Sequence, residues 1–364
     1  MRLTIPQPQF LKTLQIVERA VNDRTTLPIL ANILLETTDH ELTLTATDLD
    51  VGIRCRFPLA PPSEKGAVTL PAKKLTTIVR ELPEEPVTLE AKKNHTATIQ
   101  CGTANFRIPG LPAEDFPALP AVDRMGSISV PQGALKQLIT QTAYAMSMEE
   151  TRFILNGALL TADKGRLTMV ATDGRRLAVA HAPVAGDASI TAVLPAKTIR
   201  ELSRLLEDED EDVVIAPLKE NQLTLQFGPV TMITRLIEGQ FPQYEKVIPA
   251  VAKQRLTCDR HALINAVRRA SLMTTAASQA VLFELGGGAL VVSKESAESG
   301  SAREELPVTY TGEATTVAFN PEFWLDVLKI LEGDDVAIEL AGPDRPAVIR
   351  RPEFLYLVLP MKVA

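Results

Sequence analysis

The sequence predicts an α+β fold in which one domain-sized unit is used three times. A strand-like run ending in Thr47-Asp48 has a counterpart about 125 residues later, ending in Thr172-Asp173. Helix-like segments that follow Pro71, Pro195 and Pro321 recur at nearly the same interval. Solenoid repeats run to roughly 20–50 residues, whereas this interval is the size of a whole domain. The 364-residue chain is therefore predicted to contain three copies of one fold.

Each unit combines two helices with two sets of strands. Apolar residues recur at helical spacing over 9–21, 72–82, 132–146, 196–206, 260–271 and 322–332. The stretches between them alternate at period two and are interrupted by turn residues, which is typical of short antiparallel strands. This order favours both helices of a unit on one face of an antiparallel sheet. Two proline-containing connectors predict domains 1–125, 126–252 and 253–364.

Composition limits the class of protein. The three cysteines, Cys55, Cys101 and Cys258, are odd in number and widely spaced, which favours a reducing compartment and argues against disulfides or a thiolate zinc site. The first ten residues contain no apolar signal region, and no apolar run approaches the roughly 20 residues of a membrane span. We therefore expect a cytoplasmic protein with no membrane partner.

Charge is distributed unevenly along the chain. Its formal net charge is −7, yet the six predicted helices contain 13 Lys or Arg and only 6 Asp or Glu. On the helix over 196–206, Lys197, Arg200 and Arg204 lie nearly opposite the leucine stripe. An exposed helix face that is merely charged would explain the basic residues but not the shortage of acidic ones. Because aromatic residues make up only 4% of the chain, contact with duplex phosphates is favoured over base stacking.

No catalytic or metal-binding motif is recognisable. The four histidines have no partner at metal-ligand spacing, and G-x-S-x-G, Walker and dinucleotide glycine patterns are absent from the sequence. The Thr-Asp-Gly-Arg-Arg run at 172–176 is typical of a turn after a strand. The sequence therefore predicts no enzyme activity, no cofactor and no metal.

Several motifs together resemble a known family along the whole chain. They are TLPILANILLE at 26–36, LNGALL at 155–160, ATDGRRLA at 171–178, FPQYEKVIP at 241–249 and the C-terminal YLVLPMKVA. With the triplication, they are similar to the bacterial DNA polymerase III beta subunits, the sliding clamps. The resemblance implies a clamp fold closed into a six-domain ring as a head-to-tail homodimer, with helices inside and sheet outside. It also implies a processivity factor that encircles double-stranded DNA without sequence specificity.

Partners and site residues follow from the same resemblance. The implied partners are the polymerase alpha subunit, an ATP-driven clamp loader, and repair polymerases, ligase and mismatch-repair proteins that carry a clamp-binding motif. A partner-peptide pocket is implied at Leu155, Thr172, Gly174, Arg175, Arg176, Leu177, Pro242, Val247, Pro346, Leu357, Val358, Leu359, Pro360 and Met361. Two departures from the family pattern are Arg175, where His is usual, and the Lys-Val-Ala tail.

DNA-facing and dimer-interface residues are implied in the same way. The DNA-facing set is Lys12, Arg19, Arg24, Lys73, Arg80, Lys136, Arg152, Lys197, Arg200, Arg204, Arg268 and Arg269, with Glu149 standing unexpectedly among them. The dimer interface is expected to join Phe106 and Ile108 to Leu272 and Met273. Around it, Lys74 and Arg107 are expected to pair with Glu304 and Glu305.

Three other interpretations remain open at the level of sequence. One is a specialised clamp copy, for example a variant that confers resistance to a clamp-directed antibiotic. Another is a scaffold that binds peptides but not DNA, in which the basic helix faces would be dispensable. A third is an enzyme that uses the cleft between the second and third domains.

Overall fold

The computed structural model describes residues 1–22, 25–59, 63–122, 125–186, 188–209, 211–252 and 254–362. Two sequence predictions fall outside this part of the chain. Arg24 was expected to face DNA, and Val363 and Ala364 form the end of the unusual tail. The structure therefore does not bear on either prediction.

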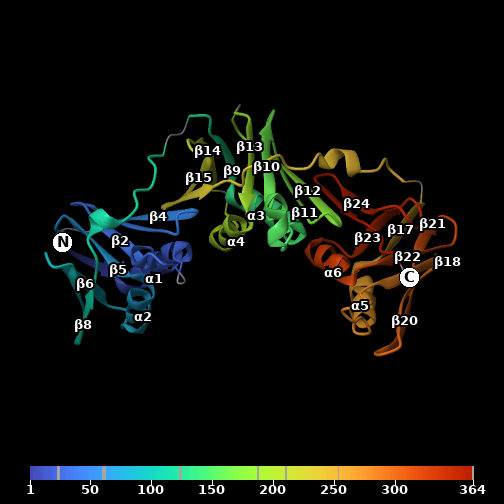
Figure 1. Cartoon of the computed structure of the whole chain (residues 1–364), viewed down its shortest axis with the longest axis horizontal. Helices are drawn as coiled ribbons and strands as arrows, with labels where there is room; N and C mark the ends of the chain where they lie inside the picture. Colours follow the sequence, from blue (N-terminus) through green and yellow to red (C-terminus); the bar gives the residue numbers. More distant parts are fainter. Residues whose placement is uncertain are drawn as a thin grey trace. The chain divides into compact units, whose positions relative to one another are not determined.

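The three repeats share one order of elements: a strand, a helix, four strands, a helix and three strands (Figure 1). The first repeat contains β1 (Arg2–Pro6), α1 (Gln7–Val17), β2 (Asn32–Thr37), β3 (Glu41–Thr47), β4 (Val51–Pro58), β5 (Gly66–Pro71), α2 (Ala72–Glu81), β6 (Pro86–Ala91), β7 (Thr96–Cys101) and β8 (Ala104–Pro109). The second contains β9 (Ile128–Pro131), α3 (Gln132–Thr142), β10 (Gly157–Asp163), β11 (Arg166–Thr172), β12 (Arg176–Pro183), β13 (Ile190–Pro195), α4 (Ala196–Leu205), β14 (Asp212–Leu218), β15 (Gln222–Phe227) and β16 (Val230–Arg235).

The third repeat follows the same order with one extra short strand, β21. It contains β17 (Gln254–Asp259), α5 (Arg260–Ser271), β18 (Val281–Gly286), β19 (Ala289–Ser296), β20 (Gly300–Pro307), β21 (Thr309–Thr311), β22 (Thr315–Phe319), α6 (Pro321–Ile330), β23 (Asp335–Leu340), β24 (Ala347–Arg351) and β25 (Phe354–Val358). All six predicted helices are present. The first begins at Gln7 rather than residue 9 because Pro8 is tolerated in the first helical turn.

Contacts divide the chain into two compact units that cut across the repeats. Unit 1 comprises Met1–Gly133, Ala185–Ala188 and Arg204–Leu236, and its described strands form the sheets β1-β6-β7-β8 and β5-β2-β3-β4-β16-β15-β14-β9. Unit 2 comprises the remainder, with the sheets β20-β19-β18-β22 and β13-β10-β11-β12-β25-β24-β23-β17-β21. The cause is strand pairing between repeats, since β4 pairs with β16 and β12 pairs with β25. Each unit thus contains one half of the central repeat.

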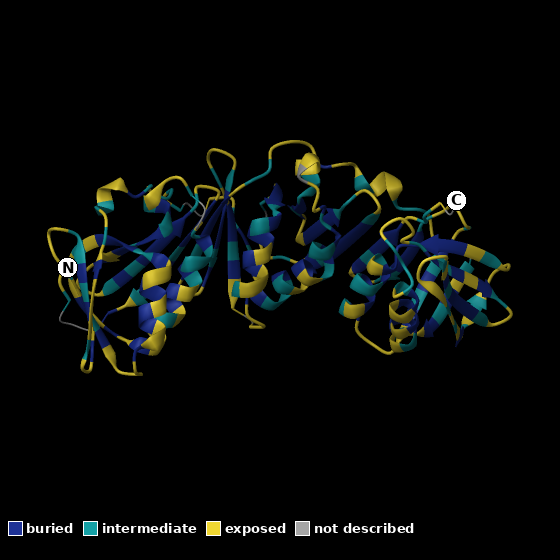
Figure 2. Cartoon of the chain, turned by 60° about the horizontal axis from the view of Figure 1, so that its bottom comes forward, coloured by how far each residue is buried: buried dark blue, intermediate teal, exposed yellow. Residues whose placement is uncertain are grey.

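The helices bury one apolar face and expose a basic one. In α2, Leu75, Ile78 and Val79 are buried whereas Lys73 and Arg80 are exposed, as the helical spacing predicts. Helix α1 packs against α2, and α5 packs against α6. Figure 2 shows the resulting division of the helices into buried and exposed strips. Among the described helices, none has the length and apolar character needed to cross a membrane.

Two buried cysteines are expected to make the stability of the fold sensitive to alkaline pH. Burial raises the pKa of Cys55 from 9.0 to about 11. Burial together with the charges of Asp259 and Asp335 raises the pKa of Cys258 from 9.0 to about 12. Above pH 9 these thiols therefore ionise in the unfolded chain while they remain protonated in the folded one.

We predict that the free energy of unfolding falls as pH rises from about 9 towards 11, by up to roughly 1.4 kcal/mol per pH unit for each thiol. The free energy of unfolding falls because the folded state then binds more protons than the unfolded state. Urea unfolding at pH 8, 9 and 10 checks this against the double variant Cys55→Ala with Cys258→Ala. The variant, which lacks both thiols, should lose less stability over this range. Equal losses in the two proteins would contradict the prediction.

Candidate functional site

The residues that the resemblance groups into a peptide pocket gather in unit 2, around the adjacent strands β12 and β25. Leu177 lies opposite Leu357, and Arg176 lies opposite Val358. Because side chains alternate between the two faces of a strand, the leucine pair and the Arg176–Val358 pair point to opposite sides of the sheet. The pocket residues therefore do not all line one surface.

The leucine face forms an apolar cluster with the chain segment that follows β16. Leu177 and Leu357 are buried together with Leu159, Val170, Val179, Val193, Phe241 and Val348. Leu155 and the partly buried Ile237, Tyr244 and Ile248 pack against this cluster. Leu177 and Leu357 are therefore almost completely buried, and they expose little surface to a ligand.

More exposed apolar side chains stand beside or close to residues of this cluster along the chain. Val247, which ends the short 3₁₀ helix Tyr244–Val247, is 56% exposed. Pro242 is exposed as well, and Pro346 is half-buried. Such apolar side chains on the surface of a folded chain are suited to contact with aliphatic and aromatic anchors of a peptide.

The turn Thr172–Arg176 is held by its own side chains. Thr172 Oγ1 accepts a hydrogen bond from Gly174 N at 3.0 Å and donates to Arg176 O at 2.6 Å. Asp173 Oδ1 accepts from Arg175 N at 2.8 Å and from Arg176 N at 3.0 Å. Gly174 has a φ of +85°, which disfavours any residue with a Cβ. The prediction that this run is a turn is confirmed.

The C-terminal tail is attached to this turn. Leu359 N donates to Arg175 O at 2.9 Å, and Met361 N donates to Ala318 O on β22 at 2.8 Å. Leu359 is exposed, whereas Pro360 and Met361 are half-buried. The tail therefore runs from the turn to an edge strand of the four-stranded sheet in unit 2.

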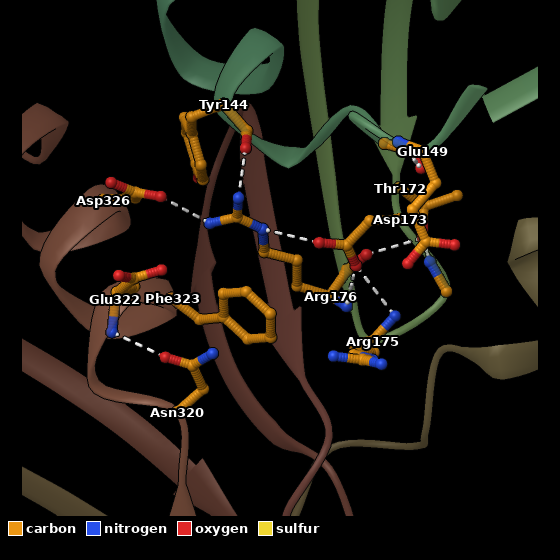
Figure 3. Close-up of polar contacts among 12 residues, drawn as sticks. Tyr144, Glu149, Thr172, Asp173, Arg175, Arg176, Asn320, Glu322, Phe323 and Asp326 are labelled. Carbon is orange, nitrogen blue, oxygen red and sulfur yellow. Dashed lines mark hydrogen bonds and ion pairs between the residues drawn. The ribbon is translucent and has the colours of Figure 1, made fainter. Parts of the chain in front are cut away.

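The guanidinium of Arg176 lies on the helix side of the sheet and is almost fully engaged (Figure 3). Its Nε donates to Asp173 Oδ2 at 3.1 Å, its Nη1 donates to Asp326 Oδ2 at 2.6 Å, and its Nη2 donates to Tyr144 O. The guanidinium carbon lies 4.4 Å from the centroid of the Phe323 ring. Burial alone lowers the pKa of Arg176, but the hydrogen bond to Asp326 and the nearby acidic groups raise it overall.

The sequence did not predict the partners of Arg176. Tyr144 follows α3, and Phe323 and Asp326 belong to α6, so these residues come from different repeats. The only local signal is that Asp326 stands between apolar residues in α6. The spacing of residues along the chain could not identify the partner of the Asp326 carboxylate, because Arg176 lies 150 positions away.

Most of the expected DNA-facing residues lie on the exposed sides of their own helices or close to them. Those that are exposed are Lys12, Lys73, Arg80, Arg200, Arg204, Arg268 and Arg269, and those that are half-buried are Arg19, Lys136 and Lys197. Arg269 forms a two-point ion pair with Glu304, with N–O distances of 2.6 and 2.8 Å. Its charge is therefore already partly neutralised within the chain.

Arg152 lies outside the six α-helices, in the short 3₁₀ segment Glu150–Leu155. Its Nε is 3.1 Å from Glu149 Oε2, and its Nη1 donates to Asp173 O at 2.9 Å. Glu149 thus attracts Arg152 and orients it towards the Thr172–Arg176 turn. This explains the acidic residue that stood unexpectedly beside the basic ones.

Apart from Lys74, which belongs to α2, the expected dimer residues lie on two edge strands and on the segment after α5. Among the described strands, β8 ends the sheet β1-β6-β7-β8, and β20 ends the sheet β20-β19-β18-β22. Leu272 is 70% exposed, Phe106 is exposed and Met273 is half-buried. Ile108 departs from the expectation, because it is only 4% exposed within the single chain. It can contribute little to an interface.

The acidic residues of the expected interface have partners within the same chain. Glu304 pairs with Arg269, and Glu305 Oε2 accepts from Arg303 at 3.1 Å. Lys74 and Arg107, the expected partners, are exposed on the other unit. Any pairing between copies must therefore compete with these contacts.

Comparison with known proteins gives matches along the whole chain. The N-terminal, central and C-terminal domain families of the DNA polymerase III beta subunit match residues 1–120, 129–243 and 245–362. The beta sliding clamps of Pseudomonas putida and Bacillus subtilis are 32% and 31% identical, each match covering all of both chains.

Solved structures give the same result. The sliding clamp of Pseudomonas aeruginosa, solved bound to griselimycin, has a TM-score of 0.95 at 32% identity and full coverage of both chains. The clamp of Bacillus subtilis has a TM-score of 0.94 at 31% identity, again over the whole of both chains. The α+β clamp fold predicted from the sequence is thereby confirmed. The chain belongs to the bacterial DNA polymerase III beta subunit family, the beta sliding clamps, which are non-catalytic processivity factors of DNA polymerase III.

Proposed function

We propose that two copies of this chain associate head to tail into a ring that encircles duplex DNA. The ring would keep the polymerase on its template without reading the sequence. The observation that carries this proposal is the match of three successive beta subunit domains over the whole chain. The edge strands β8 and β20 support it, because exposed strand edges favour pairing and a two-fold axis would form the contact twice.

The basic helix faces supply the contact with DNA. Salt screens exposed charges beyond roughly 8 Å under physiological conditions, so a phosphate backbone responds to nearby Lys and Arg more than to the overall negative charge. Contacts to phosphates position a protein on duplex DNA but carry no sequence information. A ring that slides needs this kind of contact, weak and independent of sequence.

The surface around Leu177, Val247 and Met361 serves as the partner-peptide pocket. It accepts a short segment with Leu and Phe anchors, presented by the polymerase alpha subunit, the ATP-driven clamp loader, repair polymerases, ligase or mismatch-repair proteins. The proposal also includes domain boundaries near residues 125 and 252 and a cytoplasmic location for the protein. A specialised copy of the clamp would use the same contacts with DNA and the same peptide pocket.

Retention on DNA is expected to be topological. A protein held only by phosphate contacts loses affinity steeply as salt rises, whereas a closed ring leaves a circle only by opening an interface. After loading onto nicked circular DNA by a clamp loader, the protein should remain bound through a high-salt wash. Cutting the circle should then release it. Equal retention on circular DNA and on linear DNA with unblocked ends would rule out the ring.

Charge reversal tests the helix faces separately. The triple variant Lys197→Glu, Arg200→Glu, Arg204→Glu should load poorly and remain a dimer. A matched control reverses three exposed lysines in strand connections, Lys92, Lys93 and Lys219. This control should load like the unaltered protein, although its net charge changes equally. Normal loading of the helix variant would favour a peptide-binding scaffold that does not need DNA.

A further inference from the structure

The guanidinium of Arg176 joins three elements of unit 2 at one point. It contacts Asp173 in the Thr172–Arg176 turn, the carbonyl of Tyr144 after α3, and Asp326 on α6. The side chain of Arg176 is 10% exposed. Because the donors of a guanidinium form a rigid fork, engaging several of them fixes the orientation of the group and of the backbone that carries it.

The same turn is linked to α6 by a second route. Arg175 O accepts from Leu359 N, and Met361 N donates to Ala318 O on β22. Strand β22 leads directly into Asn320, whose Oδ1 caps the start of α6 by accepting from Glu322 N at 2.9 Å. The turn, the tail, β22 and α6 thus form a circuit of contacts that Arg176 closes. Within this circuit, the charged connection between the turn and α6 is the Arg176–Asp326 ion pair.

We propose that Asp326 is a positioning residue for the partner-peptide pocket and acts through Arg176. Asp326 lies on the helix side of the sheet, so it does not belong to the apolar face formed by Leu177 and Leu357. Its carboxylate holds the guanidinium, which holds the Asp173 carboxylate and thereby the turn that presents Gly174 and Arg175. Helix α6 therefore sets the shape of one wall of the pocket. This inference rests on the proposed function of the pocket.

The test compares peptide affinities of full-length variants. Asp326→Asn keeps the shape of the side chain and removes its charge, and it should weaken binding of a Gln-Leu-x-Leu-Phe peptide roughly five- to tenfold by calorimetry. Glu332→Gln removes an exposed carboxylate just beyond α6 and should leave the affinity unchanged. Phe323→Leu, which removes the ring over the guanidinium, should weaken binding in the same direction. Melting and sedimentation test whether each variant is folded.

A double-mutant cycle separates positioning from a general structural role. If Asp326 acts through Arg176, then Asp326→Asn should change the affinity less than about twofold in an Arg176→Met background. An undiminished effect of Asp326→Asn in that background would overturn the inference. Wild-type affinity in folded Asp326→Asn would overturn it as well.

Hydrogen exchange gives a readout that does not depend on the peptide. The amides of Arg175 and Arg176 donate to Asp173 Oδ1, so a loosened turn should exchange them faster in Asp326→Asn than in Glu332→Gln. Unchanged exchange at both amides would contradict the role of Asp326. If the unaltered protein binds no peptide but the turn amides respond, the proposed pocket is wrong whereas the coupling from α6 to the turn stands.

Discussion

Replacing Leu272 and Met273 with alanine is expected to convert the proposed dimer into folded monomers. Leu272 is 70% exposed in the single chain, so it has a large apolar surface to lose on association. Fully burying a Leu or Met side chain contributes roughly 1.5–3 kcal/mol, so truncating both should weaken association on the order of 100-fold or more. Sedimentation over a range of concentrations measures this shift.

A matched control keeps the test specific to the interface. Val251 is 73% exposed but lies in the connector between the central and C-terminal repeats, outside β8, β20 and the segment after α5. Val251→Ala should sediment like the unaltered protein. A double variant at 272 and 273 that remains dimeric at low concentration would place the interface elsewhere. Ile108→Ala is not an informative alternative, because this buried residue would report on folding rather than on association.

Deleting Met361–Ala364 is expected to abolish peptide binding while leaving the oligomeric state unchanged. The deletion removes the hydrogen bond from Met361 N to Ala318 O and the half-buried Met361 side chain. The remaining tail then keeps the hydrogen bond from Leu359 N to Arg175 O, and the proposed pocket loses a flexible apolar side chain. Calorimetry with the same Leu- and Phe-containing peptide gives the affinity, and sedimentation reports the assembly.

A shorter truncation serves as the control for the tail. Deleting only Lys362–Ala364 retains Met361 and its contact with β22, so it should bind the peptide with nearly unchanged affinity. If the longer truncation also binds normally, the peptide site does not include the tail. If both truncations lose binding, residues beyond Met361 contribute more than the contacts of Met361 predict.

The specialised-copy interpretation concerns positions where the sequence departs from the family pattern, and Arg175 is one of them. Arg175 occupies the exposed end of the turn, where its backbone rather than its side chain makes the contacts described above. A change of residue type there can alter which peptides bind without disturbing the turn. Partner preference, rather than fold, is therefore where this chain is expected to differ from its relatives.

The sequence alone determined the repeat, the fold class, the six helices and the Thr172–Arg176 turn. The repeat is visible as similar segments about 125 residues apart. The helices and the turn depend on neighbours a few positions apart, because helical spacing sets which side chains share a face and a turn is closed by its own Asp and Gly. The exposed and buried sides of α2 were predictable for the same reason. The resemblance added the set of pocket residues.

Only the tertiary structure decided how those parts combine. The pairing of β4 with β16 and of β12 with β25 merges neighbouring repeats, so contacts follow two units rather than three. The same kind of long-range contact buries Ile108, gives Glu304 an intrachain partner and places Asp326 against Arg176, 150 positions away in sequence. Strand pairing between repeats and ion pairs between distant elements leave no periodic spacing in the chain. They arise when the folded backbone brings distant groups into contact, and the proposed pocket depends on those contacts.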